Sequence, residues 1–347
     1  MRNAGRGILD KPLDGVKVVE FEGLGPAPFA AMCLADMGAR VTRIGRKVPA
    51  TPPLWLDRDR DFRALDLKSE AGRAEALALI AEADVLIEGF RPGKMEALGL
   101  GPDRAFAANP ALVYGRMTGW GQQGPMAGLA GHDLNFLAMT GLLSLMGHRD
   151  RAPTPPLNLV SDFGGGGMYL AYGIVCALFK VRASGQGAVI DAAMVHGTSH
   201  LATFVHGRLA NGSWTPERES NALDGGAPFY RVYTCADGGW MAVAAVEPQF
   251  WANALAVLGF DEGVRAQQWD RADWPAQIAA ISARFAGRSR AEWEAAFAGV
   301  DACVSPVLSI AEARAHPQIA PYFEVRDGAM RPLPAPILQP PASVSGV

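Results

Sequence analysis

The chain has 347 residues, 49% of them hydrophobic, with a mean hydropathy of +0.08, which is enough to bury a full core and to form two domains. Its 32 Lys and Arg residues against 35 Asp and Glu residues give a formal charge of −3, without a basic block or an acidic tail. This charge pattern argues against nucleic acid or an anionic membrane surface as partner and favours a small molecule.

The four cysteines lie far apart and form no CxxC pair, so the sequence indicates neither a disulfide framework nor a zinc site. The first fifteen residues lack the apolar stretch of a signal peptide. The longest apolar run, 168–179, is shorter than the roughly 18 residues that span a bilayer. The C-terminal SVSGV is not a peroxisomal address of the SKL type. We therefore expect a soluble cytoplasmic enzyme that uses neither a membrane nor a metal.

Strand-like and helix-like segments alternate through the first half of the chain. Apolar segments rich in Val and Ile, separated by helices of about 10–15 residues, are typical of βαβ units with a buried parallel sheet. The pattern predicts strands at 16–23, 39–45, 84–90 and 111–119, and helices at 27–38 and 69–83. The first half is therefore predicted to be α/β.

The segment 157–169, LNLVSDFGGGGMY, places four glycines just after a carboxylate. Asp162 closes an apolar run that reads as a strand. Because glycine admits close approach of backbone or ligand at an entropic cost, something is expected to come very near Asp162. The apolar stretch that follows predicts a buried helix that ends at Gly185, with Asp162 close to its N-terminus.

The character of the chain changes after Gly212. Residues 228–246 predict two strands joined by a tight Asp-Gly-Gly turn, and helical segments such as 290–299 follow. We expect a large domain with its linker over 1–222 and a smaller α+β domain over 223–321. The Pro-rich tail 322–347 is expected to return to the large domain.

A dinucleotide fingerprint is incomplete at the first predicted strand, because FEGLGPAP lacks the last glycine of G-x-G-x-x-G. After the second predicted strand, where an NAD-binding fold has an acidic residue, the chain has Arg46. Arg46 suggests a ribose phosphate, which NADP and coenzyme A both carry. A solvated basic turn explains it equally well.

Three histidines lie close together in the sequence, and His196 and His200 are spaced as on one face of a helix, with His206 following. Such a pair can bind zinc, but Gly197 replaces the glutamate of H-E-x-x-H, so ordinary packing is the favoured interpretation.

Two further residues are candidates for chemistry. His132 follows a glycine-rich loop and opens an apolar helical stretch, and loops often carry catalytic groups, although a lone histidine is more often structural. Glu247 precedes a proline at the end of a predicted strand, and its simplest role is to cap a helix.

Eight ordered segments, including GHDLNF, SDFGGGG and EPQFW, together resemble the α-methylacyl-CoA racemases of the family III CoA-transferase superfamily from Leu13 onward. The resemblance implies that His132 and Asp162 form an acid/base pair and that Glu247 orients the histidine. It implies a 2-methyl-branched acyl-CoA substrate without a metal or redox cofactor. It also implies an interlaced homodimer, each subunit with a Rossmann-like large domain and a small domain, and a site built across two chains.

The resemblance further implies a set of positions that bind the CoA part of the substrate. These are Arg46, Leu65, Asp66, Leu67, Lys68, Gly89, Phe90, Arg91, Gly131, Asp133, Leu134, Asn135 and Phe136. Where relatives carry an arginine this chain has Ala97, so one phosphate contact is in question: CoA either binds less tightly or is held by a neighbour such as Lys94. The segment 55–64, WLDRDRDFRA, is more acidic than expected beside a polyanion.

Inverting a carbon next to a thioester requires removal of its proton from one face and return of a proton to the other. We hypothesise that His132 serves one face and Asp162 the other, while Glu247 fixes the tautomer of the imidazole. The enolate oxygen needs hydrogen-bond donors, and we expect the glycine run and the start of the helix after it to supply bare backbone N–H groups. Met139, Met146, Met168 and Met194 would suit a slot for varied acyl groups or fill the core.

Three other functions remain open. A CoA-transferase of the same superfamily would use Asp162 as a nucleophile that forms an acyl anhydride. An inactive acyl-CoA-binding protein would leave the α-proton untouched. An NADP reductase is the most distant alternative.

Overall fold

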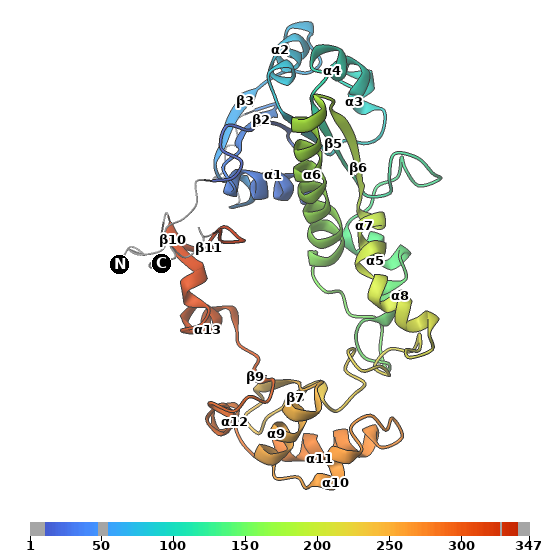
Figure 1. Ribbon diagram of the computed structural model, residues 1–347, viewed down its shortest axis with the longest axis vertical. Helices are drawn as coiled ribbons and strands as arrows, with labels where there is room; N and C mark the ends of the chain where they lie inside the picture. The colour runs from blue at the N-terminus through green and yellow to red at the C-terminus, as the bar shows by residue number, and fades with distance from the viewer. Residues whose placement is uncertain (1–10, 48–54, 327, 339–347) are drawn as a thin grey trace, which may run out of the picture. The chain divides into compact units, whose positions relative to one another are not determined.

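The computed structural model describes residues 11–47, 55–326 and 328–338 (Figure 1). The chain divides into two compact units. The first comprises the described residues of Met1–Thr140, Leu157–Ala202 and Glu324–Val347, and the second comprises Gly141–Pro156 and Thr203–Phe323. The second unit thus takes in 141–156 and 203–222, which the sequence pattern placed in the large domain.

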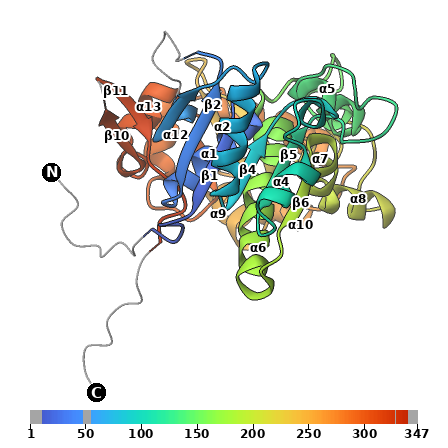
Figure 2. The same cartoon turned by 90° about the horizontal axis from the view of Figure 1, so that it is seen from above.

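A six-stranded parallel sheet forms the centre of the first unit. Its strands are β1 (Lys17–Phe21), β2 (Arg40–Gly45), β3 (Arg60–Ala64), β4 (Val85–Glu88), β5 (Val113–Thr118) and β6 (Ala188–Ala193). Their spatial order is β3-β2-β1-β4-β5-β6, and every neighbouring pair is parallel. Figure 2 labels β2, β1, β4, β5 and β6 of this sheet. The predicted α/β class and the four predicted strands are confirmed, while the edge strands β3 and β6 were not predicted.

Helices cover both faces of this sheet. They are α1 (Pro26–Asp36), η1 (Trp55–Asp57), α2 (Glu70–Ala81), α3 (Lys94–Ala97), α4 (Pro102–Ala108), α5 (Asp133–Met139), the π-helix η3 (Leu159–Met168), α6 (Tyr169–Ser184) and α7 (Met194–Leu201). Alternate strand side chains enter two cores: Val18 shares one with α1 and α6, and Val19 shares the other with α2, α3 and α4. Burial on both faces explains why these strands read as continuous apolar runs.

The second unit is α+β, as predicted. Its elements are η2 (Leu142–Leu145), α8 (Thr203–Ala210), β7 (Tyr230–Thr234), β8 (Trp240–Ala244), α9 (Pro248–Leu258), α10 (Glu262–Ala266), α11 (Trp274–Phe285), α12 (Arg290–Phe297), β9 (Val304–Pro306), α13 (Ile310–Ala315) and η4 (Ala320–Tyr322). The strands form an antiparallel sheet in the order β7-β8-β9, and Thr234 pairs with Trp240 across the predicted turn. Trp251, Phe285 and Trp293 are buried in its core. A separate pair, β10 (Phe323–Arg326) and β11 (Ala329–Pro332), follows.

The glycine run lies inside the π-helix η3, so the prediction that Asp162 closes a strand is wrong. A Cβ on Gly165 would lie 2.4 Å from Oγ1 of Thr198 in α7, and one on Gly167 would lie 2.8 Å from the carbonyl oxygen of Pro26 in α1. The glycines therefore allow the π-helix to pack directly against α7 and α1. We expected bare backbone for a thioester here, but Gly165, Gly166 and Gly167 are buried against the neighbouring helices.

The helical stretch Leu159–Ser184 is longer than the apolar run visible in the sequence, because η3 and α6 are continuous. By length and composition alone it could cross a membrane, since its most apolar window has a mean hydropathy of 1.3. Its residues Leu170 and Ile174 are fully buried against the sheet, as in the core helix of a globular domain. It ends at Gly185, whose φ of 68° is the left-handed stop that the sequence predicted.

The substitution Gly165→Ala tests the packing role of the glycine run. Because the new methyl group would overlap Thr198, we expect the free energy of unfolding to fall by about 1–3 kcal/mol. The matched control is Gly207→Ala in α8, where a Cβ would meet no atom within 4 Å and helix propensity should stabilise by up to about 1 kcal/mol. Calorimetric melting that shows the same small shift for both variants would contradict this explanation.

Candidate active site

A cavity of about 630 Å³ lies at the carboxyl ends of β1, β4 and β5. Its lining includes Leu24–Ala27 after β1, Gly89–Pro92 after β4, and both His132 and Asp162. The strand order of the sheet reverses between β1 and β4. In open parallel sheets, ligands bind in the crevice at such a reversal. The structure therefore brings the two predicted acid/base residues together at the position where this topology binds ligands.

His132 directly precedes α5 and is held there by its neighbours. Its backbone N–H donates to Oδ1 of Asn135 (3.1 Å). Phe136, one turn into the helix, is buried, and a Cβ on Gly119 or Gly131 would lie within 2.7 Å of its ring. Both glycines thus allow the loop before His132 to close over Phe136, which fixes the start of the helix.

Asp162 lies in the first turn of the π-helix, with its carboxylate beside the start of α1. A Cβ on Gly25 would lie 3.5 Å from Oδ2 of Asp162, and Nδ2 of Asn158 donates to the same oxygen at 3.5 Å. Burial raises the pKa of Asp162 above its ordinary value; the Asn158 hydrogen bond opposes this shift, and the Asp133 carboxylate adds to it. A positive charge on His132 would lower the pKa of Asp162. A raised pKa suits a carboxyl group that must both accept and donate a proton.

Asp133 has a role that the sequence did not reveal. Its side chain is buried, and Oδ2 accepts the backbone N–H groups of Ser161 (2.7 Å) and Asp162 (2.8 Å). The carboxylate therefore satisfies two of the N–H groups that every helix start leaves without intrahelical partners. These two N–H groups are therefore not available to the substrate, because Asp133 accepts both of them.

Glu247 belongs to the second unit, whereas His132 and Asp162 belong to the first. It precedes α9 and Pro248, but its carboxylate makes no capping hydrogen bond to that helix. The simple capping role is therefore not observed. Its predicted contact with His132 stays a prediction.

Most of the predicted CoA positions line one of two cavities in the first unit. A second cavity of about 250 Å³ is lined by Arg46, Leu65, Asp66, Leu67, Lys68 and Phe90. Gly89, Phe90, Arg91, Gly131 and Phe136 line the larger cavity, so Phe90 borders both. Lys94 lines the smaller cavity and Ala97 does not, as expected if Lys94 substitutes for the missing arginine.

Three predicted CoA positions line neither cavity. Asp133 caps the π-helix, Asn135 caps α5, and Leu134 is partly exposed beside them. Asp133 and Asn135 therefore act on helix starts, Asp133 on η3 and Asn135 on α5.

The acidic segment 55–64 is neutralised within the protein. Asp57 pairs with Arg43, and Asp61 pairs with Arg40 at 3.2 Å. These carboxylates therefore repel a bound polyanion less than the sequence suggested.

Of the two histidines on α7, His200 is engaged in another contact. Nδ1 of His200 lies 2.6 Å from the hydroxyl group of Tyr169. Among the described residues, no group of three or more His, Cys, Asp or Glu side chains is placed to hold a metal ion.

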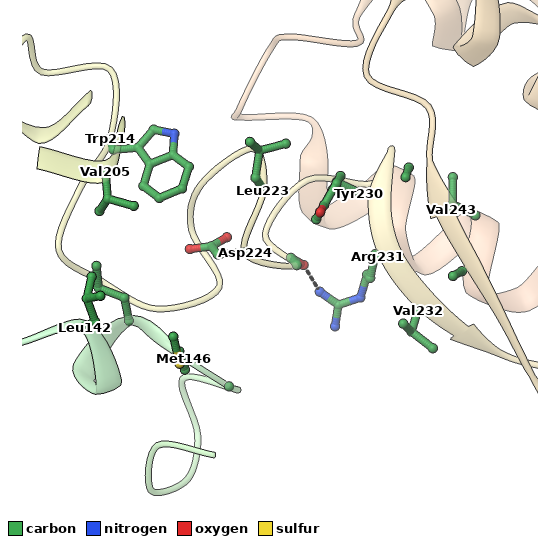
Figure 3. Close-up of a pocket in the computed structure, with 15 residues that line it drawn as sticks. Leu142, Met146, Val205, Trp214, Leu223, Asp224, Tyr230, Arg231, Val232 and Val243 are labelled. Carbon is green, nitrogen blue, oxygen red and sulfur yellow. Dashed lines mark hydrogen bonds between the residues drawn. The ribbon is translucent and has the colours of Figure 1, made fainter. Parts of the chain in front are cut away.

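The second unit has an apolar cavity of its own, of about 580 Å³ (Figure 3). Leu142, Met146, Val205, Trp214 and Leu223 are among its lining residues. Its two charged lining residues are already bound: Asp224 accepts backbone N–H groups of its own loop, and Arg231 donates to the carbonyl oxygen of Gly225. Such a lining fits an apolar chain.

Comparison with known proteins identifies the relatives of the chain. The family profile described as CoA-transferase family III matches residues 13–346. The chain is 46% identical over 329 residues to the α-methylacyl-CoA racemase of Mus musculus, covering 94% of this chain and 86% of that protein. It is 43% identical to the racemase of Homo sapiens over the same shares. A CAIB/BAIF family protein from Brucella suis has a similar structure, with a TM-score of 0.78 at 28% identity, covering 96% of this chain and 94% of that one.

Substitutions at Asp133 test its positioning role. Asp133→Asn keeps an acceptor for the two N–H groups but removes the negative charge that raises the pKa of Asp162. In the reaction direction in which Asp162 must start ionised, kcat/KM falls at low pH as Asp162 becomes protonated. We expect this fall to move to lower pH in Asp133→Asn. Asp133→Ala leaves both donors unpaired, and we expect it to lower the free energy of unfolding by about 0.5–2 kcal/mol and to lower kcat further. Equal kinetics of the two variants, with an unmoved acid limb, would refute this role.

Proposed function

Because the chain belongs to CoA-transferase family III, we propose that it is an isomerase that inverts the α-carbon of 2-methyl-branched acyl-CoA thioesters. Its identity of 43–46% to two α-methylacyl-CoA racemases over 94% of the chain supports this activity. The observation that carries the proposal is that His132 and Asp162 line one cavity at the strand-order reversal of the sheet. A racemase needs two such groups, and a nucleophilic transferase needs only the carboxylate.

The proposed reaction is a 1,1-proton transfer. One of the pair removes the α-proton and the other returns a proton to the opposite face, so His132 and Asp162 exchange protonation states with each turnover. Neutral and charged forms of both groups must be accessible near the working pH, which burial favours by raising the pKa of Asp162. Glu247 would orient the imidazole and stabilise its charged form.

The enolate intermediate needs donors at its oxygen. The N–H groups of Ser161 and Asp162 are taken by Asp133, and Pro26 and Pro28 at the start of α1 carry no N–H. In α5 the N–H groups of Asn135 and Phe136 donate to the carbonyl oxygen of His132, which leaves those of Asp133 and Leu134 as the two that precede the first bonds of the helix. We propose that they face the thioester oxygen.

The two cavities of the first unit fit the two ends of the proposed substrate. The smaller cavity combines apolar walls with the cationic side chains of Arg46, Lys68 and Lys94, which suit a nucleotide and its phosphates. Phe90 borders both cavities, so an extended pantetheine arm can pass it to bring the thioester to His132 and Asp162. Proton transfer needs no redox group, and we predict that none is used and that the enzyme works in the cytoplasm.

A second copy of the chain is the proposed partner. An exposed apolar stripe runs along α6 at helical spacing. It is formed by Met168, just before the helix, and by Tyr172, Val175 and Phe179 on it; Tyr172 is 69% exposed and Phe179 is 79% exposed. Exposed apolar stripes of this kind mark interaction surfaces. The opposite face of α6 is packed into the sheet core, so the helix belongs to the folded domain. We therefore favour contact of this stripe with a second subunit over insertion into a membrane.

The exchange of the α-proton tests the activity. In deuterium oxide, one epimer of a 2-methylacyl-CoA should gain deuterium and racemise, and NMR follows both processes. His132→Ala and Asp162→Ala should each lower the rate of inversion by about 10²–10⁴-fold, because each removes one proton carrier. If a variant still exchanges the α-proton of one epimer for deuterium but no longer inverts the α-carbon, the group that remains acts on the face of that proton. The result would assign each group to its face.

Three outcomes would reject the racemase. A new thioester formed from added free carboxylate, without α-exchange, would indicate the transferase, with Asp162 as nucleophile. Binding of acyl-CoA without either reaction would indicate an inactive binding protein. Binding of NADPH instead of acyl-CoA, seen as a change in nicotinamide fluorescence, would indicate a reductase.

The oligomeric state tests the stripe on α6. The wild-type chain should sediment as a dimer, and the double variant Tyr172→Glu with Phe179→Glu should shift toward monomer because it places charges in an apolar interface. Ile310→Glu is the control, since Ile310 is equally exposed (71%) but lies on α13. A monomeric wild type, or a double variant as dimeric as the control, would contradict the proposed interface.

A further inference from the structure

Two carboxylates line the smaller cavity of the first unit beside its cations: Glu22, and Asp66, which accepts the backbone N–H of Lys68 (3.0 Å). Glu22, which follows β1, lines it together with Arg46, Lys68 and Lys94. Ile44, Leu65 and Phe90 are among its apolar walls. A site built only for phosphates would gain nothing from the Glu22 carboxylate, because like charges disfavour each other at short range.

Glu22 is positioned at the end of the neighbouring strand β2. Its Oε2 is an acceptor for the backbone N–H of Arg46 (3.4 Å), and a Cβ on Gly45 would lie only 2.6 Å from the same oxygen. The absent side chain of Gly45 thus makes room for the carboxylate. Glu22 and Arg46 consequently meet where the first two strands of the sheet end.

In dinucleotide-binding sheets, the residue after the second strand decides how a ribose is recognised: an acidic residue accepts ribose hydroxyl groups, and an arginine binds a ribose phosphate. This chain supplies the arginine from the β2 end and the carboxylate from the β1 end, in one cavity. The two groups have opposite preferences for the 3′-phosphate of CoA.

We infer that Glu22 is a specificity-determining residue for the nucleotide end of the substrate, a role that rests on the proposed CoA thioester. Its carboxylate accepts a hydroxyl or amine hydrogen of the nucleotide and opposes the 3′-phosphate. The cavity therefore gains little affinity from that phosphate despite three nearby cations. The wild-type protein accepts thioesters of CoA and of 3′-dephospho-CoA with similar affinity.

Binding of the two nucleotides measures this effect. Isothermal titration at constant ionic strength gives Kd for CoA and for 3′-dephospho-CoA with the wild-type chain, Glu22→Gln and Glu75→Gln. Glu75 is exposed on α2 and lines neither cavity, so Glu75→Gln removes the same charge elsewhere in the unit. We expect wild type to bind the two ligands within about threefold, and Glu22→Gln to bind CoA about tenfold tighter with little change for 3′-dephospho-CoA.

The outcomes separate this inference from the function on which it rests. If both ligands bind and Glu22→Gln leaves the ratio of their Kd values unchanged, or shifts it no more than Glu75→Gln does, the role of Glu22 is refuted. If wild type binds neither ligand, the proposed CoA thioester fails, and the inference fails with it.

Discussion

The Asp133 carboxylate accepts the backbone N–H groups of Ser161 and Asp162, and this contact joins the start of α5 to the start of the π-helix η3. Because His132 is the residue before Asp133, the same contact fixes the position of Asp162 relative to His132. The carboxylate is buried, so each of its hydrogen bonds is stronger than it would be in water. It also adds to the raised pKa of Asp162, and one side chain thus contributes to both geometry and protonation.

The sheet decides where these two helix starts meet. The reversal of strand order between β1 and β4 leaves a crevice at their carboxyl ends, and the loops after β1, β4 and β5 line it. The glycines of η3 allow the π-helix to lie against α1 and α7, which brings Asp162 to the edge of that crevice. A larger residue at Gly165 or Gly167 would move the helix, and with it the carboxylate.

The sequence predicted the central strands because they are buried among apolar neighbours, and α6 because both its packed face and its exposed face are apolar, which gives a continuous hydrophobic signal. It missed β3, RDFRA, because this strand is polar. Its Arg60 donates to the buried Glu20, 40 positions earlier, at 2.9 Å. No local pattern shows such a pairing, and burial raises the pKa of Glu20 even beside its partner.

The sequence predicted only part of the candidate site, because some of its contacts join segments that are far apart in the chain. Glycine-rich segments singled out His132 and Asp162, their acid/base roles came from the resemblance, and the structure places both in one cavity. The side-chain role of Asp133 and the position of Glu22 beside Arg46 depend on contacts between distant segments, which single-sequence patterns do not contain.

The central claim is that the α-carbon of the substrate lies between His132 and Asp162. A crystal structure of the full chain with a bound 2-methylacyl-CoA tests this most directly. The account predicts the α-carbon in the cavity at the strand-order reversal, with an imidazole nitrogen and a carboxylate oxygen on opposite faces, each within about 3–3.5 Å. An α-carbon that either group cannot reach, or that both approach from one face, would contradict it.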